Sequence, residues 1–380
     1  MASAFFNEDH ESIREMAQQF AEGTLAGIAA EIDKTNEFPE EVVQEMAELG
    51  FYGLKIPEEY GGLGLDMRSY VCVMEEVAKK CATATLFISS ANSLSTQPIL
   101  LSGTEEQKAK YLPGVADGSV KISFALTEPN AGSDAGSLKT KAVKDGDFYV
   151  LNGTKCFITM APIADYHIVY AKTDPDKGTK GISAFIVSKD LPGVSVGKHE
   201  EKMGQHGVPV SDLILEDVRV PADCLLGKEN MGFINAMKTL NVGRVGVASM
   251  ALGIAQEALD LAVEHTKNRV QFGKPLCKNQ ALAFMMADME TKLNAARNLV
   301  YNAAWLMDNK EDATKAASMA KYFTTEAAIE IVNKSLQLHG GYGYSQEYEI
   351  ERLYRDVRIT SIYEGSSQVQ QMVISGALLR

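Results

Sequence analysis

The sequence predicts an α+β protein of several domains: a helical N-terminal domain over residues 1–118, an antiparallel β-barrel-like middle domain over residues 119–226, and a C-terminal four-helix bundle over residues 227–380. The hydrophobic pattern carries this prediction, because its period changes from about 3.6 residues to about 2 and back again. The length of 380 residues is enough for two or three domains with large cores.

The N-terminal region shows the start and stop signals of helices. The segment PEEVVQEMAELG begins with Pro39, has acidic residues in its first turn and stops at Gly50, as a helix should. A second helix is indicated by apolar residues at helical spacing, namely Met74, Val77, Ala78 and Cys81.

The middle region alternates with a period of two. We predict a hairpin in DFYVLNGTKCFIT, with Asn152-Gly153 as its turn, because these residues favour the positive φ angles of tight turns. The segments YHIVYAK, GISAFIVS and DLILEDVRV follow as strands. No helical segments separate these strands, so the pattern favours an antiparallel sheet over parallel βαβ units.

The C-terminal region returns to helical spacing after Gly227. Two apolar stripes predict long helices packed as a bundle. They run through Met286, Met289, Leu293, Ala296, Val300, Ala303 and Met307, and then through Ala316, Ala320, Phe323, Ala327 and Ile331. We interpret the methionines of the first stripe as core residues.

Composition and charge exclude several classes of function. The net charge of −13 at pH 7 argues against nucleic acid or an anionic membrane as a main partner. The five cysteines are scattered without a CxxC pair, which is typical of a reduced intracellular protein without disulfides or a zinc site. We find no signal, transit or transmembrane pattern, and we expect a cytoplasmic protein that binds no metal.

Nucleotide-binding and hydrolase motifs are also missing from the sequence. No GxGxxG follows a predicted strand and no GxxxxGK[ST] occurs, which excludes the Rossmann and P-loop nucleotide sites. No GxSxG is present for a hydrolase serine.

Three segments that are polar or rich in glycine are candidates for binding, and each has an ordinary structural alternative. Residues 124–140 place small residues after a strand, where backbone N–H groups could approach a ligand, or they form a plain wide turn. Residues 268–275 carry Arg269 and Lys274, which could hold a pyrophosphate or simply end a helix. Residues 336–348 contain Gly340 and Gly341, for which a helix C-cap is the simpler interpretation.

Glu364 is the candidate for acid–base chemistry. It is the one acidic residue between Val357 and Arg380, and it lies on a turn before the final helix, which begins near Ser366. It could act as a base in an apolar pocket, since burial raises a carboxyl pKa toward neutrality. Alternatively, Glu364 has only a structural role, as a negative charge that the dipole of the following helix stabilises.

Taken together, six motifs in order resemble signatures of the acyl-CoA dehydrogenase family: LTEPNAGSDAGS, NGTKCFIT, GRVGVASMALGIAQ, NRVQFGKP, QLHGGYGY and RLYRDVRITSIYEGSSQVQ. The resemblance covers essentially the whole chain, and YEGSSQ closely resembles the segment in which short- and medium-chain members place their base. It implies a three-domain fold, a homotetramer built as a dimer of dimers, and one FAD per subunit.

The resemblance also implies a reaction and a partner. Members of the family remove a proton from the α-carbon and a hydride from the β-carbon of an acyl thioester, and Glu364 matches their base. The base residue's own N–H and a flavin hydroxyl bind the thioester carbonyl there, which stabilises the enolate charge. We therefore expect FAD-dependent dehydrogenation of an acyl-CoA to the trans-2-enoyl-CoA, with electrons passed to an electron-transferring flavoprotein.

Site residues follow from the resemblance position by position. The residues that it places around the flavin are Phe124, Leu126, Thr127, Gly132, Ser133, Phe157, Ile158 and Thr159. It assigns the FAD of a neighbouring subunit to Arg269, Gln271, Phe272, Gln280, Gln337 and Gly341, and the adenosine-pyrophosphate end to Ser366 and Gln368. The acyl-CoA would contact Ser133, Asn241, Gly243, Arg244, Tyr363 and Gly365.

The chain departs from the family pattern beside the flavin edge that faces the electron acceptor. Phe157 stands where many members have tryptophan, and Met160-Ala161 where many have Asn-Gly or Asn-Ala. The predicted pocket floor, FISSANSLS, has small side chains at residues 89–91, which would accommodate a bulky or aromatic acyl group.

Two alternatives stay open at the level of sequence. The same site would serve an enoyl-CoA reductase acting on an aromatic or unsaturated acyl-CoA, because the chemistry is reversible. A catalytically silent acyl-CoA-binding or assembly protein could share the fold, although Glu364 and the flavin motifs are retained. Acyl chain, direction of the reaction and electron bifurcation by the partner are not encoded in any motif that we recognise.

Overall fold

The computed structural model describes residues 5–379, so the first four residues of the predicted N-terminal domain and Arg380 lie outside the described residues. The N-terminal region is helical as predicted, and α3 follows Pro39 and ends just before Gly50, whose φ is 72°. Its helices are α1 (Glu8–Phe20), α2 (Ala26–Thr35), α3 (Glu40–Glu48), α4 (Met67–Lys80), α5 (Ala82–Ser89), α6 (Gln97–Ser102) and α7 (Glu105–Ala116), with π-helical segments at Ala21–Leu25 and Ser90–Leu94.

The middle region forms one curled, seven-stranded sheet of order β1-β4-β2-β3-β7-β6, in which β5 pairs with β4. The strands are β1 (Ile122–Ala125), β2 (Lys141–Asp145), β3 (Phe148–Thr159), β4 (Tyr166–Lys172), β5 (Ile182–Ser188), β6 (Val194–His199) and β7 (Val210–Pro221). A second apolar cluster, separate from the main core, fills the sheet.

Most strand pairs are antiparallel, as predicted, but β4 also has parallel neighbours. Strand β1 pairs in parallel with the first half of β4, and Lys141 of β2 pairs in parallel with Lys172 at its end. The prediction missed these pairs because it required a helix for each parallel connection. Here the β2–β3 hairpin spans the distance between β1 and β4, so the sheet needs no crossover helix.

The predicted turn at Asn152-Gly153 is wrong. These residues lie inside β3, and the β2–β3 hairpin turns at Gly146, whose φ is 59°. The pairing of β3 with β7 shifts register between Leu151 and Gly153, which is a bulge. Glycine is required at this bulge because a Cβ at Gly153 would lie 2.3 Å from Thr140 Oγ1.

The C-terminal region is a bundle of long helices. They are α8 (Gly232–Asn268), α9 (Gln280–Asp308), α10 (Thr314–His339), α11 (Glu349–Val357) and α12 (Ser367–Leu378). A short hairpin of β8 (Val270–Gln271) and β9 (Lys274–Pro275) joins α8 to α9. The predicted apolar stripe of α9 lies mostly in the core, with Met289, Leu293 and Val300 buried.

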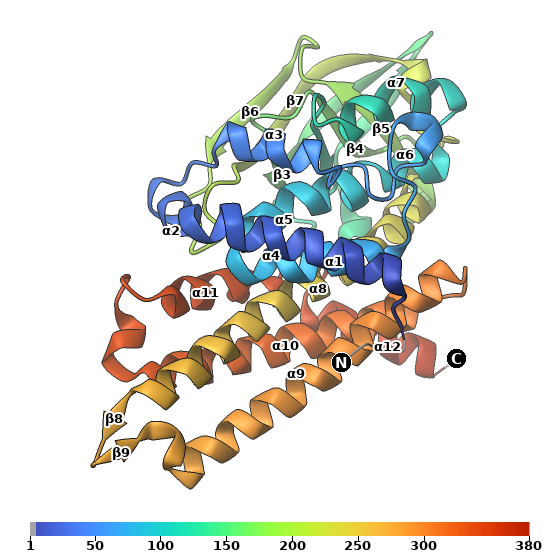
Figure 1. Ribbon diagram of the computed structural model, residues 1–380. Helices are drawn as coiled ribbons and strands as arrows, with labels where there is room; N and C mark the ends of the chain where they lie inside the picture. Colours follow the sequence, from blue (N-terminus) through green and yellow to red (C-terminus); the bar gives the residue numbers. More distant parts are fainter. Residues whose placement is uncertain (1–4, 380) are drawn as a thin grey trace.

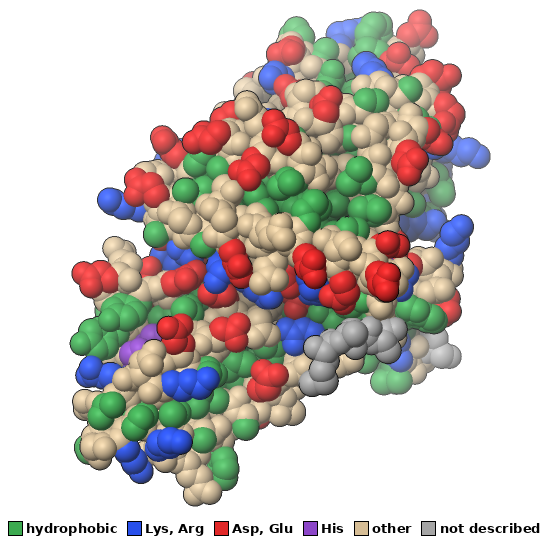
Figure 2. Space-filling view, in the orientation of Figure 1, with side chains coloured by type: hydrophobic (Ala, Val, Ile, Leu, Met, Phe, Trp, Pro, Cys, Tyr) green, Lys and Arg blue, Asp and Glu red, His purple; other side chains and the backbone are tan. Residues whose placement is uncertain are grey.

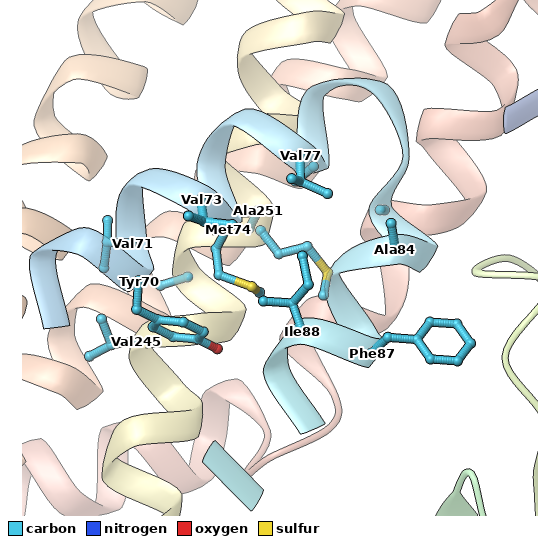
Figure 3. Packing of buried hydrophobic residues seen from close by; sticks show 14 of the residues in the cluster. Tyr70, Val71, Val73, Met74, Val77, Ala84, Phe87, Ile88, Val245 and Ala251 are labelled. Carbon is cyan, nitrogen blue, oxygen red and sulfur yellow. The ribbon is translucent and has the colours of Figure 1, made fainter. Parts of the chain in front are cut away.

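The three regions pack in layers (Figure 1). Helices α1, α4 and α5 lie between the sheet and the C-terminal bundle, and α4 packs along α8. Figure 3 shows this contact, with Tyr70 and Met74 of α4 beside Val245 and Ala251 of α8. The predicted three-part architecture is thus confirmed, and α8 is its central element.

Helix α8 is unusually long and apolar. By length and apolar composition alone it could cross a membrane, with a mean hydropathy of 1.3 in its most apolar window. However, 83% of that window is buried inside the protein. A core helix of a large bundle has the same composition, and α8 occupies that place.

Candidate active site

Glu364 lies on a sharp turn between a 3₁₀ segment, Arg358–Ser361, and α12. The turn has two consecutive left-handed residues, Glu364 with φ 52° and Gly365 with φ 90°. The helix that follows is capped by Ser366, whose hydroxyl accepts a hydrogen bond from the N–H of Val369. A left-handed glutamate is costly, so the surrounding contacts must hold this conformation in place.

The carboxylate of Glu364 points at α8. Its Oε2 is sealed from solvent and has no hydrogen-bond partner among the described residues. A Cβ at Gly243 would lie 1.9 Å from this oxygen, so only glycine fits there. One turn further along α8, a Cβ at Gly246 would lie 2.4 Å from the buried hydroxyl of Tyr70. Two glycines of α8 therefore make room for polar groups from α4 and from the turn before α12.

Two buried cations face Glu364. The pocket is therefore not purely apolar, which differs from the apolar pocket that the sequence predicts. They are Lys321 of α10 and Arg244 of α8, with exposed fractions of 0% and 5%. Burial raises the pKa of Glu364 to about 7, against the opposing charges of Lys321 and Arg244. A carboxyl group that titrates near neutrality can both accept and return a proton, which is what a general acid–base catalyst needs.

Arg244 is held by its own helix and by α10. Its Nη1 donates to Asn241 Oδ1 at 2.7 Å and to Ser318 Oγ at 3.4 Å, while its Nε has no partner among the described residues. Burial lowers the pKa of Arg244, and the charge of Glu364 opposes this. The structure thus brings together five of the predicted acyl-CoA residues around the base, namely Asn241, Gly243, Arg244, Tyr363 and Gly365.

The predicted flavin residues of the middle region converge where β1 and β3 end. The N–H of Cys156 donates to the carbonyl of Thr127 at 2.9 Å, which places the segment 124–127 beside the segment 157–159. Behind them, buried Lys155 donates to Glu128 Oε1 at 2.8 Å and to the carbonyl of Leu126 at 3.1 Å. This ion pair fixes the loop that carries Gly132 and Ser133.

The surface above these residues suits a flat, partly apolar cofactor. Phe157 sits on a β-bulge with φ 56° and is 65% exposed. Gly132 and Ser133 are exposed, and a Cβ at Gly132 would meet nothing within 4 Å. An exposed aromatic ring beside open backbone is what an aromatic ring system with polar edges would cover, so the residues fit a flavin. In residues 5–379 no group of three or more His, Cys, Asp and Glu side chains could hold a metal ion.

A third group of predicted residues lies at the tip of the bundle. The β8–β9 hairpin carries Arg269, Gln271 and Phe272, and Phe272 is 99% exposed. The guanidinium of Arg269 lies 5.3 Å from the ring centre of Tyr342, which follows Gly341. Gln280 and Gln337 are exposed at the neighbouring helix ends. Hydrophobic and basic side chains lie together at this end of the molecule (Figure 2).

The tip of the bundle is remote from the base. Arg244 and Arg269 are separated by most of α8, a 37-residue helix, which at 1.5 Å per residue is roughly 38 Å. Figure 1 shows the hairpin and α12 on different sides of the bundle. One chain therefore does not unite all predicted cofactor residues. Gln368, by contrast, is exposed on the first turn of α12, close to the base.

Sequence reasoning missed two buried polar residues next to the base, Lys321 and Gln370. Both have an exposed fraction of 0%. For Lys321 a signal existed, because it falls in line with Ala317, Thr324 and Ala328 at helical spacing, where a lysine is out of place. For Gln370 we see no signal, since glutamines are frequent on exposed helix faces.

Comparisons with known proteins identify one and the same family along nearly the whole chain. Residues 7–119, 123–218 and 230–379 match the family models described as the N-terminal, middle and C-terminal domains of acyl-CoA dehydrogenase. A 3-(aryl)acrylate reductase of Clostridium sporogenes is 58% identical, over 99% of this chain and 100% of the relative. The caffeyl-CoA reductase-Etf complex subunit CarC of Acetobacterium woodii is 57% identical, over the same shares. The structure of butyryl-CoA dehydrogenase from Megasphaera elsdenii superposes with a TM-score of 0.97 at 44% identity, over 100% of both chains.

Proposed function

Since this chain belongs to the acyl-CoA dehydrogenase family and is an oxidoreductase acting on CH–CH bonds, we propose that it interconverts an acyl-CoA thioester and its trans-2-enoyl-CoA with FAD as cofactor. Glu364 handles the proton at the α-carbon. The carbon–carbon double bond forms when this proton and a hydride from the β-carbon leave, and it is reduced when both return.

The observation that carries this proposal is the state of Glu364. Its Oε2 is buried, has no partner among the described residues and points at a glycine, and its pKa lies near neutrality. A structural carboxylate in a protein interior is normally paired, because an unpaired buried charge is costly. The arrangement suits a group that must meet a substrate, and it speaks against a catalytically silent binding protein.

The flavin would be held by the residues at the ends of β1 and β3, with Phe157, Ile158 and Thr159 on one side and Leu126, Thr127 and Ser133 on the other. When bound, it supplies the two-electron chemistry at the β-carbon, which no amino-acid side chain can perform. Ser366 and Gln368, at the start of α12, would reach its adenosine-pyrophosphate end.

We favour reduction of an aryl-substituted 2-enoyl thioester as the physiological direction. The support is that the relatives at 58% and 57% identity are named as reductases of an arylacrylate and of caffeyl-CoA. Small side chains at Ser89, Ser90 and Ala91 would leave room for a ring. Oxidation of a short saturated acyl-CoA is the second candidate, supported by the likeness to butyryl-CoA dehydrogenase at 44% identity.

The partners are proposed on similar grounds. An electron-transferring flavoprotein would exchange electrons with the flavin, as the name of the 57% identical relative associates that protein with Etf. A cytoplasmic homotetramer would let the exposed hairpin tip, with Arg269 and Phe272, contact the FAD of a neighbouring subunit. Arg269→Ala should then weaken FAD retention and the oligomer together, because ligand binding and assembly are linked. Unchanged FAD affinity and unchanged size on a sizing column would contradict this assignment.

The experiment that tests the proposal uses the purified protein under anaerobic conditions. Denaturation should release FAD and not FMN. The oxidised protein should lose its visible flavin absorbance with butyryl-CoA or 3-phenylpropanoyl-CoA, and the photoreduced protein should regain it with crotonyl-CoA or cinnamoyl-CoA. A faster change of flavin absorbance with 3-phenylpropanoyl-CoA and cinnamoyl-CoA would support the proposed preference for aryl-substituted substrates. An unchanged flavin spectrum with all four thioesters would mean that the protein only binds acyl-CoA.

A further inference from the structure

Lys321 is an unusual residue for the middle of a helix in a protein core. It lies on α10, its exposed fraction is 0%, and among the described residues it makes no ion pair within 4.0 Å. Its Nζ instead donates to the carbonyl of Gly365 at 2.7 Å. A buried ammonium group is costly, so its presence calls for a reason at this location.

The carbonyls of the Glu364 turn are held from two sides. Gln370, on the first turns of α12, donates from Nε2 to the same Gly365 carbonyl at 2.7 Å and to the carbonyl of Glu364 at 3.3 Å. Lys321 and Gln370 therefore bind the two left-handed residues from α10 and α12. The N–H of Glu364 has no backbone acceptor within residues 5–379.

We infer that Lys321 is a positioning residue for the catalytic base, which holds the Glu364 turn through the Gly365 carbonyl and sets the charge that the carboxylate experiences. This inference rests on the proposed function. It assigns Lys321 two separable contributions, a hydrogen bond to the turn and a positive charge near the carboxylate.

The charge contribution depends on all groups that face Glu364. From α10 the group is Lys321, from α8 it is Arg244, and from α4 and the turn itself they are the neutral hydroxyls of Tyr70 and Tyr363. Lys321 is the stronger of the two cations in lowering the pKa of Glu364. Burial in turn lowers the pKa of Lys321 to about 8; Glu364 and Glu326 oppose this, whereas Arg244 lowers it further. Both groups thus titrate near neutrality and influence each other.

Three variants separate these contributions. Lys321→Met removes both the donor and the charge, and Lys321→Gln removes the charge but keeps a donor. Lys334→Met is the matched control, because Lys334 lies on the same helix but pairs with Asp288 and Glu330 at 2.8 and 2.6 Å on the surface. The holoenzyme with bound FAD is used throughout.

The first readout is the pH profile of flavin reduction by a saturated acyl-CoA. Reduction requires the carboxylate, so its rate rises with pH through the pKa of Glu364. In Lys321→Met and Lys321→Gln this rise should move to higher pH by about one unit, which lowers the rate up to about tenfold on the acid side. Lys321→Met should also have a lower plateau at high pH, since its turn is less well held. Lys334→Met should match the wild type.

The second readout is independent of catalysis. The free energy of unfolding by urea is measured from pH 5 to pH 7.5 with and without Glu364→Gln. The stability that Glu364 contributes falls from about pH 4.5 upward in both proteins; in the wild type this fall should level off near pH 7, whereas in Lys321→Gln it should continue to pH 7.5, and this difference should vanish in the Glu364→Gln background.

The outcomes distinguish this inference from the proposed function. If the pH profile and the unfolding curve of Lys321→Gln coincide with those of the wild type, the charge contribution is overturned, and if those of Lys321→Met coincide as well, the whole role of Lys321 is overturned. If the wild type itself does not reduce its flavin, the proposed function fails, and the unfolding measurements alone decide the inference. If Lys321→Met does not fold, the comparison of Lys321→Gln with Lys334→Met still decides it.

Discussion

Two glutamates of this protein, the buried Glu75 and the partly buried Glu364, have similar neighbours but opposite pKa shifts. Each faces two cations and has a tyrosine nearby: Glu75 has Arg14, Arg297 and Tyr301, and Glu364 has Arg244, Lys321 and Tyr363. Burial raises the pKa of both. At Glu75 this effect is outweighed and the pKa is lowered, whereas the pKa of Glu364 rises to about 7.

The difference lies in direct hydrogen bonds. Glu75 Oε1 accepts from Arg297 Nε at 3.0 Å, and its Oε2 accepts from the Tyr301 hydroxyl at 2.5 Å and from Arg14 at 3.5 Å. Glu364 Oε2 accepts nothing from the described residues, and the hydroxyl of Tyr363 donates to Met250 Sδ at 3.3 Å instead.

Nearby cations alone therefore do not make a carboxylate structural. Glu75 is fully paired and ties α1, α4 and α9 together. Glu364 has cations close enough to limit its pKa but none bonded to it, so it can exchange a proton with a ligand. Four measurements test this distinction between the two glutamates.

The largest expected effect is on the reaction of Glu364→Gln. Glutamine has almost the shape of glutamate but cannot accept the proton, so flavin reduction in a stopped-flow trace should fall by roughly 10²–10⁴-fold. The variant should fold and keep its flavin. Near-normal reduction would show that another group takes the proton. Loss of folding or of flavin would mean that Glu364 serves the helix rather than the chemistry.

Glu75→Gln should show the reverse pattern. It removes the buried carboxylate from Arg297 and from Arg14, of which Arg14 keeps Glu76 at 3.0 Å, and breaking such a pair typically costs about 3 kcal/mol of stability. The urea midpoint should drop accordingly, while the folded fraction reduces its flavin at the normal rate. A specific loss of rate with unchanged stability would erase the distinction between the two glutamates.

The pH dependence of stability should have opposite signs at the two sites. The raised pKa of Glu364 stabilises the fold below about pH 4.5, and this stabilisation is lost as the pH rises through about 7. The free energy of unfolding of Glu364→Gln should therefore rise relative to that of the wild type across this pH window, by about 3 kcal/mol at most. The lowered pKa of Glu75 gives stability above 4.5 that is lost as the pH falls. The deficit of Glu75→Gln should thus shrink in acid. Parallel pH curves for both variants would refute this assignment.

The smallest effects concern the two tyrosines. Tyr301→Phe removes a hydrogen bond to a charged carboxylate, which typically costs about 1.5–3 kcal/mol. Tyr363→Phe removes only a contact with a thioether sulfur, and its cost should stay below about 1 kcal/mol. Thermal or urea unfolding of the two single variants measures both values. Equal costs would indicate that Tyr363 has a stronger partner.

Much of the fold could be predicted from the sequence because it depends on local patterns. The stripe through Met289 and Leu293 on α9 and the alternation in β3 and β7 reflect which faces must be buried. The resemblance of six motifs identified the family, since each is a contiguous segment. The isolated position of Glu364 before the last helix was also visible, because it is a property of neighbours along the chain.

Only the tertiary structure decided what surrounds these segments. Asn152-Gly153 has the composition of a turn, yet packing against Thr140 places it in a bulge of β3. Lys321 and Arg244 reach the Glu364 turn from α10 and α8, far away along the chain. Local propensity follows from each residue and its neighbours, whereas burial, charge and the pKa of a carboxylate depend on groups that meet only after the chain has folded.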